Sequence, residues 1–340
     1  MNKKQQTSGI QSYIPILASL GSYQKDWLRF DVIAAVSVWA LLVPQGIAYA
    51  SIAGMPPQYG LYAALGALVG YALFGSAKQV ITGPSATVAA VSATVIALLA
   101  SSGSDDWIAY TAALAITAAL IYILLGLLKM GWISNFLSSA VLEGFVFAFG
   151  IGLIIDQSHK LLGVEKVEGS YFQVLIGTLQ ELPETSISTL VVGGSALIIL
   201  LLMRRYLPKW PRALIVVIVA IAASSLLDLE SYGVSIVGEV PTGLPTIGLP
   251  GISSGSMVTL VMGGLAVIFV GFSEALAAAK NSASKHNYEI DPSQEMTAQG
   301  MANGISGLFG GFAVTGSLSK TTVADSAGQK SQIASLVTAG

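Results

Sequence analysis

The sequence has no cysteine and little charge, since Asp, Glu, Lys and Arg together make up only 10% of its 340 residues. The missing cysteines exclude disulfide bonds. The low charge excludes an ordinary soluble domain, in which about a quarter of the residues are charged. The sequence also lacks a Gly-x-x-x-x-Gly-Lys-Ser/Thr loop, and no carboxylate pair or histidine cluster has catalytic or metal-ligand spacing. We therefore predict no enzymatic activity, no use of ATP, no metal, no cofactor and no nucleic-acid partner.

Hydrophobic residues make up 54% of the chain, and the mean hydropathy is +0.73. Because a membrane-spanning helix needs about 17–25 mostly apolar residues, the sequence predicts an all-α polytopic membrane protein with about ten full spans. We place these spans near 32–54, 58–76, 80–100, 107–128, 132–156, 187–206, 212–228, 256–279, 293–311 and 316–328, with the start of an eleventh near Gln332. Residues 1–30 have no signal-peptide pattern and predict a cytoplasmic N-terminal segment, in which residues 11–30 lie at the membrane surface.

The distribution of lysine and arginine predicts the orientation of these spans. Loops on the cytoplasmic side of a membrane are enriched in both residues. With the N-terminus in the cytoplasm, all 16 lysines and arginines fall on that side except Lys160, Lys166 and Lys320. We therefore expect a multi-pass protein of the lipid bilayer, located in the cell membrane and, for a bacterium, in the inner membrane.

Two runs of small and polar residues interrupt the predicted spans: Thr82–Thr87 (TGPSAT) and Thr315–Lys320 (TGSLSK). Non-helical backbone at membrane depth is tolerated only where protein buries it or where it lines a wet cavity. Paired breaks of this kind are typical of discontinuous helices whose N-termini point at a binding site. A helix N-terminus has free N–H groups and a partial positive charge, so the pattern predicts that the ligand is an anion.

Several motifs together resemble the SulP-type anion permeases, the bacterial sulfate permeases that are related to animal anion exchangers and prestin. In the first half these are Leu42–Ala50 (LVPQGIAYA), Pro56–Tyr62 (PPQYGLY), Phe74–Ser76 and Thr82–Pro84. In the second half they are Phe272–Glu274, Ala279-Lys280, Lys285–Tyr288, Gln294-Glu295, Gly300, Asn303-Gly304 and Thr315–Lys320. The resemblance covers essentially the whole chain, and the LVPQGIAYA run is long and specific.

This resemblance implies a fourteen-span fold made of two inverted seven-span repeats, with broken spans 3 and 10. Spans 1–4, here residues 31–130, would belong to a core domain, and spans 5–7, here 131–230, to a gate domain. Residues 231–340 would hold core spans 8–10 and the start of span 11. The remaining gate spans and the cytoplasmic STAS domain of the family would lie beyond this sequence, and the full-length form would be a homodimer.

The resemblance also places a substrate pocket among residues of spans 1, 3 and 10. Pro44 bends the first span, and Gln45 and Tyr49 follow it on one face of the helix. Hydrogen bonding between helices is the alternative role for their polar atoms. Small and hydroxyl residues at the two breaks would let an anion approach free N–H groups; these are Ser85, Ala86, Thr87, Ser317 and Ser319.

Two charged residues inside predicted spans are further candidates. Lys320 would attract the anion, although lysine lacks the planar fork of the arginine that many relatives carry here. The alternative is a lysine that extends to the membrane surface. Glu274 in the eighth span is a candidate for coupling, because a buried carboxylate binds and releases a proton. Sodium is a second possible coupling ion, and a structural ion pair with Lys320 is the other role for Glu274.

The sequence thus predicts secondary active transport of a small anion (sulfate, bicarbonate or a dicarboxylate) by proton symport or anion exchange. An uncoupled anion channel could use the same pocket, and a rate that saturates with anion concentration would favour a carrier. A nucleobase transporter could use the same architecture, but the Pro-Gln-Gly run favours anions.

Overall fold

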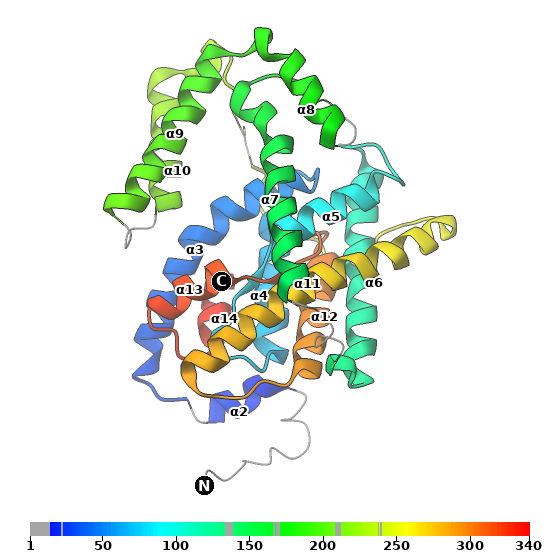
Figure 1. Cartoon of the computed structure of the whole chain (residues 1–340). Coiled ribbons are helices and arrows are strands. Elements are labelled where there is room, and N and C mark those ends of the chain that lie inside the picture. Colours follow the sequence, from blue (N-terminus) through cyan, green and yellow to red (C-terminus); the bar gives the residue numbers. More distant parts are fainter. Residues whose placement is uncertain are drawn as a thin grey trace. The chain divides into compact units, whose positions relative to one another are not determined.

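The computed structural model describes residues 14–21, 23–132, 139–165, 167, 171–207, 212–236, 238 and 240–340. The regular secondary structure of these residues is almost entirely helical, so the predicted all-α class is confirmed (Figure 1). Residues 1–13 and 22 of the predicted N-terminal segment lie outside the described part of the chain. The chain divides into two compact units, one formed by Met1–Leu137 with Pro241–Gly340 and one formed by Ser138–Val240. The domain boundaries predicted from the sequence lie at 130 and 230.

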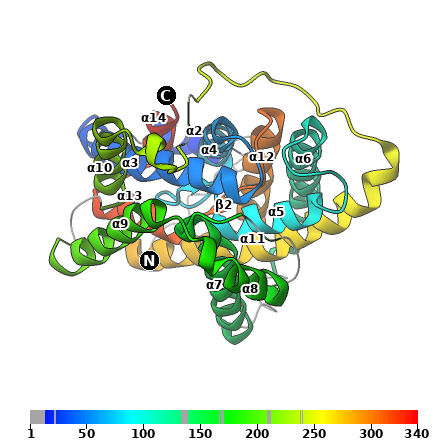
Figure 2. The same ribbon diagram turned by 90° about the horizontal axis from the view of Figure 1, so that it is seen from above.

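The first unit combines the first and last parts of the chain. Its helices are α2 (Pro15–Gly21), α3 (Trp27–Ile52), α4 (Pro57–Phe74), α5 (Ala86–Ile96), α6 (Asp105–Leu127), η4 (Ser254–Ser256), α11 (Met257–His286), α12 (Pro292–Leu308), α13 (Leu318–Ser326) and α14 (Ile333–Ala339). Helix α12 packs between α4 and α6, and α3 packs against α4 (Figure 2). Helix α11 packs against α5, α6 and α13.

Small residues allow α12 to approach both of its neighbours closely. A Cβ atom added at Gly66 or Gly70 of α4 would lie 2.6 Å from backbone atoms of Ser306 or Ala302 in α12. On the other side, a Cβ atom at Gly307 would lie 2.6 Å from the side chain of Ile116 in α6. Close backbone approach through small residues is typical of helix contacts in membranes.

A two-stranded antiparallel ribbon lies at the centre of the first unit. Strand β1 (Thr82–Gly83) pairs with β2 (Thr315–Gly316), with Thr82 opposite Gly316. The pairing continues for one more bond, because Ser317 N donates to Ile81 O at 2.9 Å. Helix α5 follows β1 and helix α13 follows β2. The predicted spans 80–100 and 316–328 thus each consist of a short strand and a short helix.

The second unit contains α7 (Ser139–Leu162), α8 (Tyr171–Gln180), η2 (Leu182–Glu184), α9 (Ile187–Tyr206), α10 (Arg212–Leu227) and η3 (Leu229–Tyr232). Helix α7 packs against α8 and α9, and α9 packs against α10. Residues 157–186 were predicted to be a connection between two spans, whereas the structure has the helix α8 within this stretch. With 10 residues, α8 is about 15 Å long, too short to cross a bilayer.

Four helices in the described part of the chain are long and apolar enough to cross a membrane: α3, α6, α9 and α11. Helix α11 continues to His286, beyond the predicted end of its span at 279, because the helix ends only where Asn287 adopts a left-handed conformation (φ 54°). The number of spans and the inverted repeat therefore stay predictions.

Candidate functional site

Lys320 connects the start of α13 with the start of α5. It is the third residue of α13, and only 1% of its surface is exposed. Its Nζ donates a hydrogen bond of 2.7 Å to the carbonyl oxygen of Pro84, just before the N-cap residue Ser85 of α5. The alternative in which Lys320 extends to the surface is therefore wrong. A buried positive charge lies where the two short helices begin.

Tyr49 lies on α3 near this charge, and Gln45 lies on the same helix one turn before Tyr49. The ammonium of Lys320 is 5.5 Å from the ring centroid of Tyr49, within the range of a cation–π interaction. Gln45 precedes Tyr49 by one helical turn, and its buried Oε1 has no hydrogen-bond partner among the described residues. An amide side chain with unused polar capacity is thus available on the face of α3 that carries Tyr49.

Glu274 of α11 accepts two hydroxyl hydrogen bonds from the start of α5. Ser85 Oγ donates to one carboxylate oxygen at 3.0 Å, and Thr87 Oγ1 donates to the other. The two hydroxyl oxygens are 2.7 Å apart. No ion pair within 4.0 Å joins the carboxylate of Glu274 to Lys320, both of which lie in the described part of the chain. The predicted ion pair between Glu274 and Lys320 is therefore not a direct contact, although the two opposite charges lie close enough to attract each other.

The two short helices begin in different ways. Ser317 caps α13, because its Oγ accepts from Lys320 N at 3.4 Å, and it lies 3.1 Å from the exposed Ser319 hydroxyl. Ser85 stands at the N-cap of α5 but makes no capping hydrogen bond, since its hydroxyl contacts Glu274 and Thr87 instead. The first turn of α5, which opens with the small residue Ala86, therefore has N–H groups that no side chain of its N-cap satisfies.

The structure thus forms two sets of contacts, one of Tyr49 and Lys320 with the carbonyl oxygen of Pro84 and one of Ser85, Thr87 and Glu274, which meet where Pro84 precedes Ser85 in the chain. Ser317 joins the first set through the backbone of Lys320. Gln45 lies on α3, Ala86 on α5 and Ser319 on α13, and the hydrogen bonds among the described residues connect none of them to Glu274 or to the Lys320 ammonium. In the described ranges, no cluster of three or more His, Asp or Glu side chains is arranged to hold a metal ion.

Sequence reasoning missed a fully buried amide beside the ribbon. Gln299 of α12 has no exposed surface, and its Nε2 donates to Thr82 Oγ1 at 3.2 Å. Its Oε1 has no partner among the residues that the structure describes. Thr315 on the other strand donates from Oγ1 to Gly271 O at 2.5 Å. The low hydropathy of the segment 293–311 was the available signal, since polar residues in a span usually face protein.

Two fully buried carboxylates that the sequence analysis left without a role hold the segments on either side of the site. Glu295 of α12 accepts from Tyr71 Oη at 2.6 Å, from Ser76 N and Oγ at 2.9 and 2.6 Å, and from Ala77 N at 3.1 Å. Asp31 of α3 accepts from Lys330 N at 2.7 Å and from Ser331 N and Oγ at 3.1 and 2.7 Å. Glu295 thus fixes the segment that leads into β1, and Asp31 fixes the segment that follows α13.

The chain is similar to known transport proteins over nearly its whole length. The family model described as the sulfate permease family matches residues 28–340. A "Probable sulfate transporter" of Mycobacterium tuberculosis is 31% identical over 328 residues, which cover 96% of this chain and 59% of that protein. The chain therefore spans about three fifths of the length of that relative.

Two solved structures share its fold. The murine solute carrier 26 family member A9 anion transporter, in an inward-facing state, matches with a TM-score of 0.90 and 28% identity, covering 100% of this chain and 60% of that one. The transmembrane domain of the cyanobacterium bicarbonate transporter BicA matches with a TM-score of 0.82 and 25% identity, covering 93% of this chain and 82% of that one.

Proposed function

Because the chain belongs to the sulfate permease family, we propose that it performs secondary active transport of a small anion: sulfate, bicarbonate or a dicarboxylate. Its relatives and its apolar helices identify it as a multi-pass membrane protein. Proteins named as a sulfate transporter and a bicarbonate transporter are among those it resembles. The observation that carries the proposal is the buried ammonium of Lys320 at the point where α5 and α13 begin. A cation beside helix N-termini attracts an anion.

The proposed anion site lies between the first turns of α5 and α13. Lys320 has three N–H donors, of which one is directed to Pro84 O, so the others are available to an anion. The amides of Ala86 and Thr87, with no cap from Ser85, would supply backbone donors on the α5 side. On the α13 side Ser317 and Ser319 would supply hydroxyls, and Gln45 and Tyr49 would close the site along α3.

Glu274 is the proposed coupling residue. Its carboxylate contacts two hydroxyls of the same helix start that would bind the anion. A proton on this carboxylate removes a negative charge next to the site and turns one of its oxygens into a hydrogen-bond donor. Proton symport follows if the loaded carrier crosses only with the proton bound. Anion exchange follows if a second anion, carried in the opposite direction, is required in place of the proton. Sodium is the remaining candidate for the coupling ion.

Uptake into vesicles tests the proposed activity. We expect the purified protein, reconstituted in lipid vesicles, to take up radiolabelled sulfate or bicarbonate at a rate that saturates with anion concentration. Unlabelled anion should compete and uracil should not. A rate that rises linearly with concentration would show a channel, and inhibition by uracil would show a nucleobase transporter.

Bound anion should protect the openings of both short helices. Two helix N-termini near one buried cation repel each other when the site is empty, because like partial charges lie close together. An anion relieves this repulsion, and a ligand at 100 times its dissociation constant stabilises the bound form by about 2.7 kcal/mol. Hydrogen exchange with and without sulfate should therefore show slower exchange at residues 83–90 and 316–323. Protection confined to α7, α9 and α10 would contradict this location of the site.

A further inference from the structure

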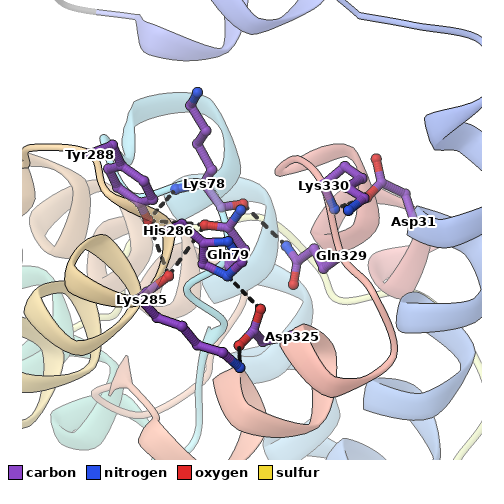
Figure 3. A network of polar contacts seen from close by, with 10 residues as sticks. Asp31, Lys78, Gln79, Lys285, His286, Tyr288, Asp325, Gln329 and Lys330 are labelled. Atoms are coloured by element: carbon purple, nitrogen blue, oxygen red, sulfur yellow. Dashed lines mark hydrogen bonds and ion pairs between the residues drawn. The ribbon is translucent and has the colours of Figure 1, made fainter.

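The far end of α13 is held by a second set of charges, remote from Lys320. Asp325, in the last turn of α13, forms ion pairs with Lys285 Nζ and with His286 Nε2, the latter at 2.6 Å (Figure 3). Lys285 and His286 are the last two residues of α11. The side chain of Asp325 is 11% exposed, whereas those of Lys285 and His286 are 61% and 33% exposed. A mostly buried carboxylate on α13 thus meets two more exposed cationic side chains on α11.

This contact connects the same two helices that carry the charges of the proposed site. Helix α11 carries Glu274 and helix α13 carries Lys320. Asp325 follows Lys320 by five residues, so the two lie about 7.5 Å apart along the axis of α13. A helix of 9 residues moves as a rigid body, and a shift at its last turn changes the position of its first turn. The ion pairs of Asp325 therefore constrain where the ammonium of Lys320 lies.

The neighbouring segments are held by neutral donors instead. Tyr288 donates to Gln79 Oε1 at 3.0 Å and accepts from Lys78 N at 3.2 Å. Gln329 donates to the carbonyl oxygen of Lys78 at 3.3 Å. Figure 3 shows these residues in one cluster with Asp325 and His286. Amide, hydroxyl and backbone groups such as these are uncharged near neutral pH. Hydrogen bonds between neutral groups therefore hold the segment before β1 and the segment after α13.

His286 is the second partner of Asp325 beside Lys285. Its Nε2 lies 2.6 Å from one carboxylate oxygen, while the ammonium of Lys285 contacts the other. Because two adjacent residues of α11 contact the two oxygens of one carboxylate, they fix both the position and the orientation of Asp325.

We propose that Asp325 is a positioning residue for anion binding: Lys285 and His286 hold it, and this fixes α13 and the ammonium of Lys320. The inference rests on the proposed function for its link to anion binding, but the hold itself exists without an anion.

Hydrogen exchange in α13 tests the hold directly, without any anion. Replacing Asp325→Asn should speed exchange at residues 318–326 by about fivefold, since a partly exposed ion pair contributes up to about a fivefold factor. The charge exchange Lys285→Asp with Asp325→Lys should restore protection, while Lys285→Asp alone should not. Glu289→Gln, which changes an exposed carboxylate in the next loop, is the matched control and should leave α13 unchanged. Equal protection in wild type and Asp325→Asn would overturn the proposal.

Anion affinity separates a positioning role from a merely structural one. The sulfate dissociation constant is measured in parallel, and it should rise about fivefold in Asp325→Asn. If wild type binds none of sulfate, bicarbonate and a dicarboxylate while α13 still loosens in Asp325→Asn, the proposed function fails and the hold stands; if wild type binds one of these anions and α13 does not loosen, the hold fails.

Discussion

Replacing Lys320 with alanine is expected to weaken anion binding by about 5- to 150-fold, which corresponds to about 1–3 kcal/mol. A cation 4 Å from an anion contributes about 4 kcal/mol at an effective dielectric constant of ~20, before desolvation is subtracted. Lys320 is nearly fully buried, so water screens its charge weakly. Calorimetric titration with sulfate measures the effect. An alanine variant that binds sulfate as tightly as wild type would show that the ammonium does not serve the site.

Two further substitutions separate the charge of Lys320 from its contact with Pro84. Alanine also leaves the carbonyl oxygen of Pro84 without its donor, and an unsatisfied buried group costs about 1–3 kcal/mol of stability. Lys320→Gln keeps an N–H donor but loses the charge. Its stability to unfolding should therefore match that of wild type, while it should bind sulfate more weakly than wild type does. Lys320→Arg keeps the charge and should retain binding. If Lys320→Gln binds like wild type, the hydrogen bond to Pro84 and not the charge is what matters.

The breaks at Thr82–Thr87 and Thr315–Lys320 were predictable because their signal is local. A cluster of glycine, proline and hydroxyl residues inside an apolar run is a loop signal that can be read without knowledge of the rest of the fold. The two short helices, α5 and α13, begin at these breaks. The antiparallel pairing of Thr82 with Gly316 was not predictable, because it joins segments more than two hundred residues apart and nothing in either segment specifies its partner.

The carboxylates show where sequence reasoning stops. Glu274 was noticed because it interrupts an apolar span. Glu295 was not assigned a role because it follows Asp291 and Pro292, and an acid in the first turn of a helix usually faces water and interacts with the helix dipole. In the structure it is fully buried and accepts hydrogen bonds from Tyr71 and from the segment before β1. Only the packing of α12 against α4 makes this carboxylate internal.

The partner of Lys320 could not be predicted for a similar reason. Opposite charges favour a pair between Lys320 and Glu274, and the sequence offers few other choices inside the membrane. The structure instead directs Lys320 to the backbone of Pro84, and it directs Glu274 to Ser85 and Thr87. Proline has no N–H group, so the turn before α5 exposes carbonyl oxygens that need a donor. This leaves the two charges close to one site but not neutralised by a direct contact.

Replacing Glu274 with glutamine is expected to abolish proton-driven accumulation of anion while the protein still folds and binds anion. Glutamine has nearly the same shape, and its oxygen can accept a hydrogen bond from one of the two hydroxyls while its NH2 group donates to the other. It cannot bind and release a proton, so it resembles the protonated state at every pH.

Accumulation under an imposed proton gradient gives the sharpest measurement of this effect. Each proton carried with the anion supports about a tenfold concentration ratio per pH unit of gradient, so wild-type vesicles should accumulate sulfate or bicarbonate well above equilibrium. Glu274→Gln vesicles should stop at the equilibrium level, yet still exchange labelled for unlabelled anion. Glu289→Gln, on an exposed loop, should accumulate like wild type. If Glu274→Gln still concentrates the anion when the gradient is applied, the proton travels by another group and Glu274 serves only to hold the start of α5.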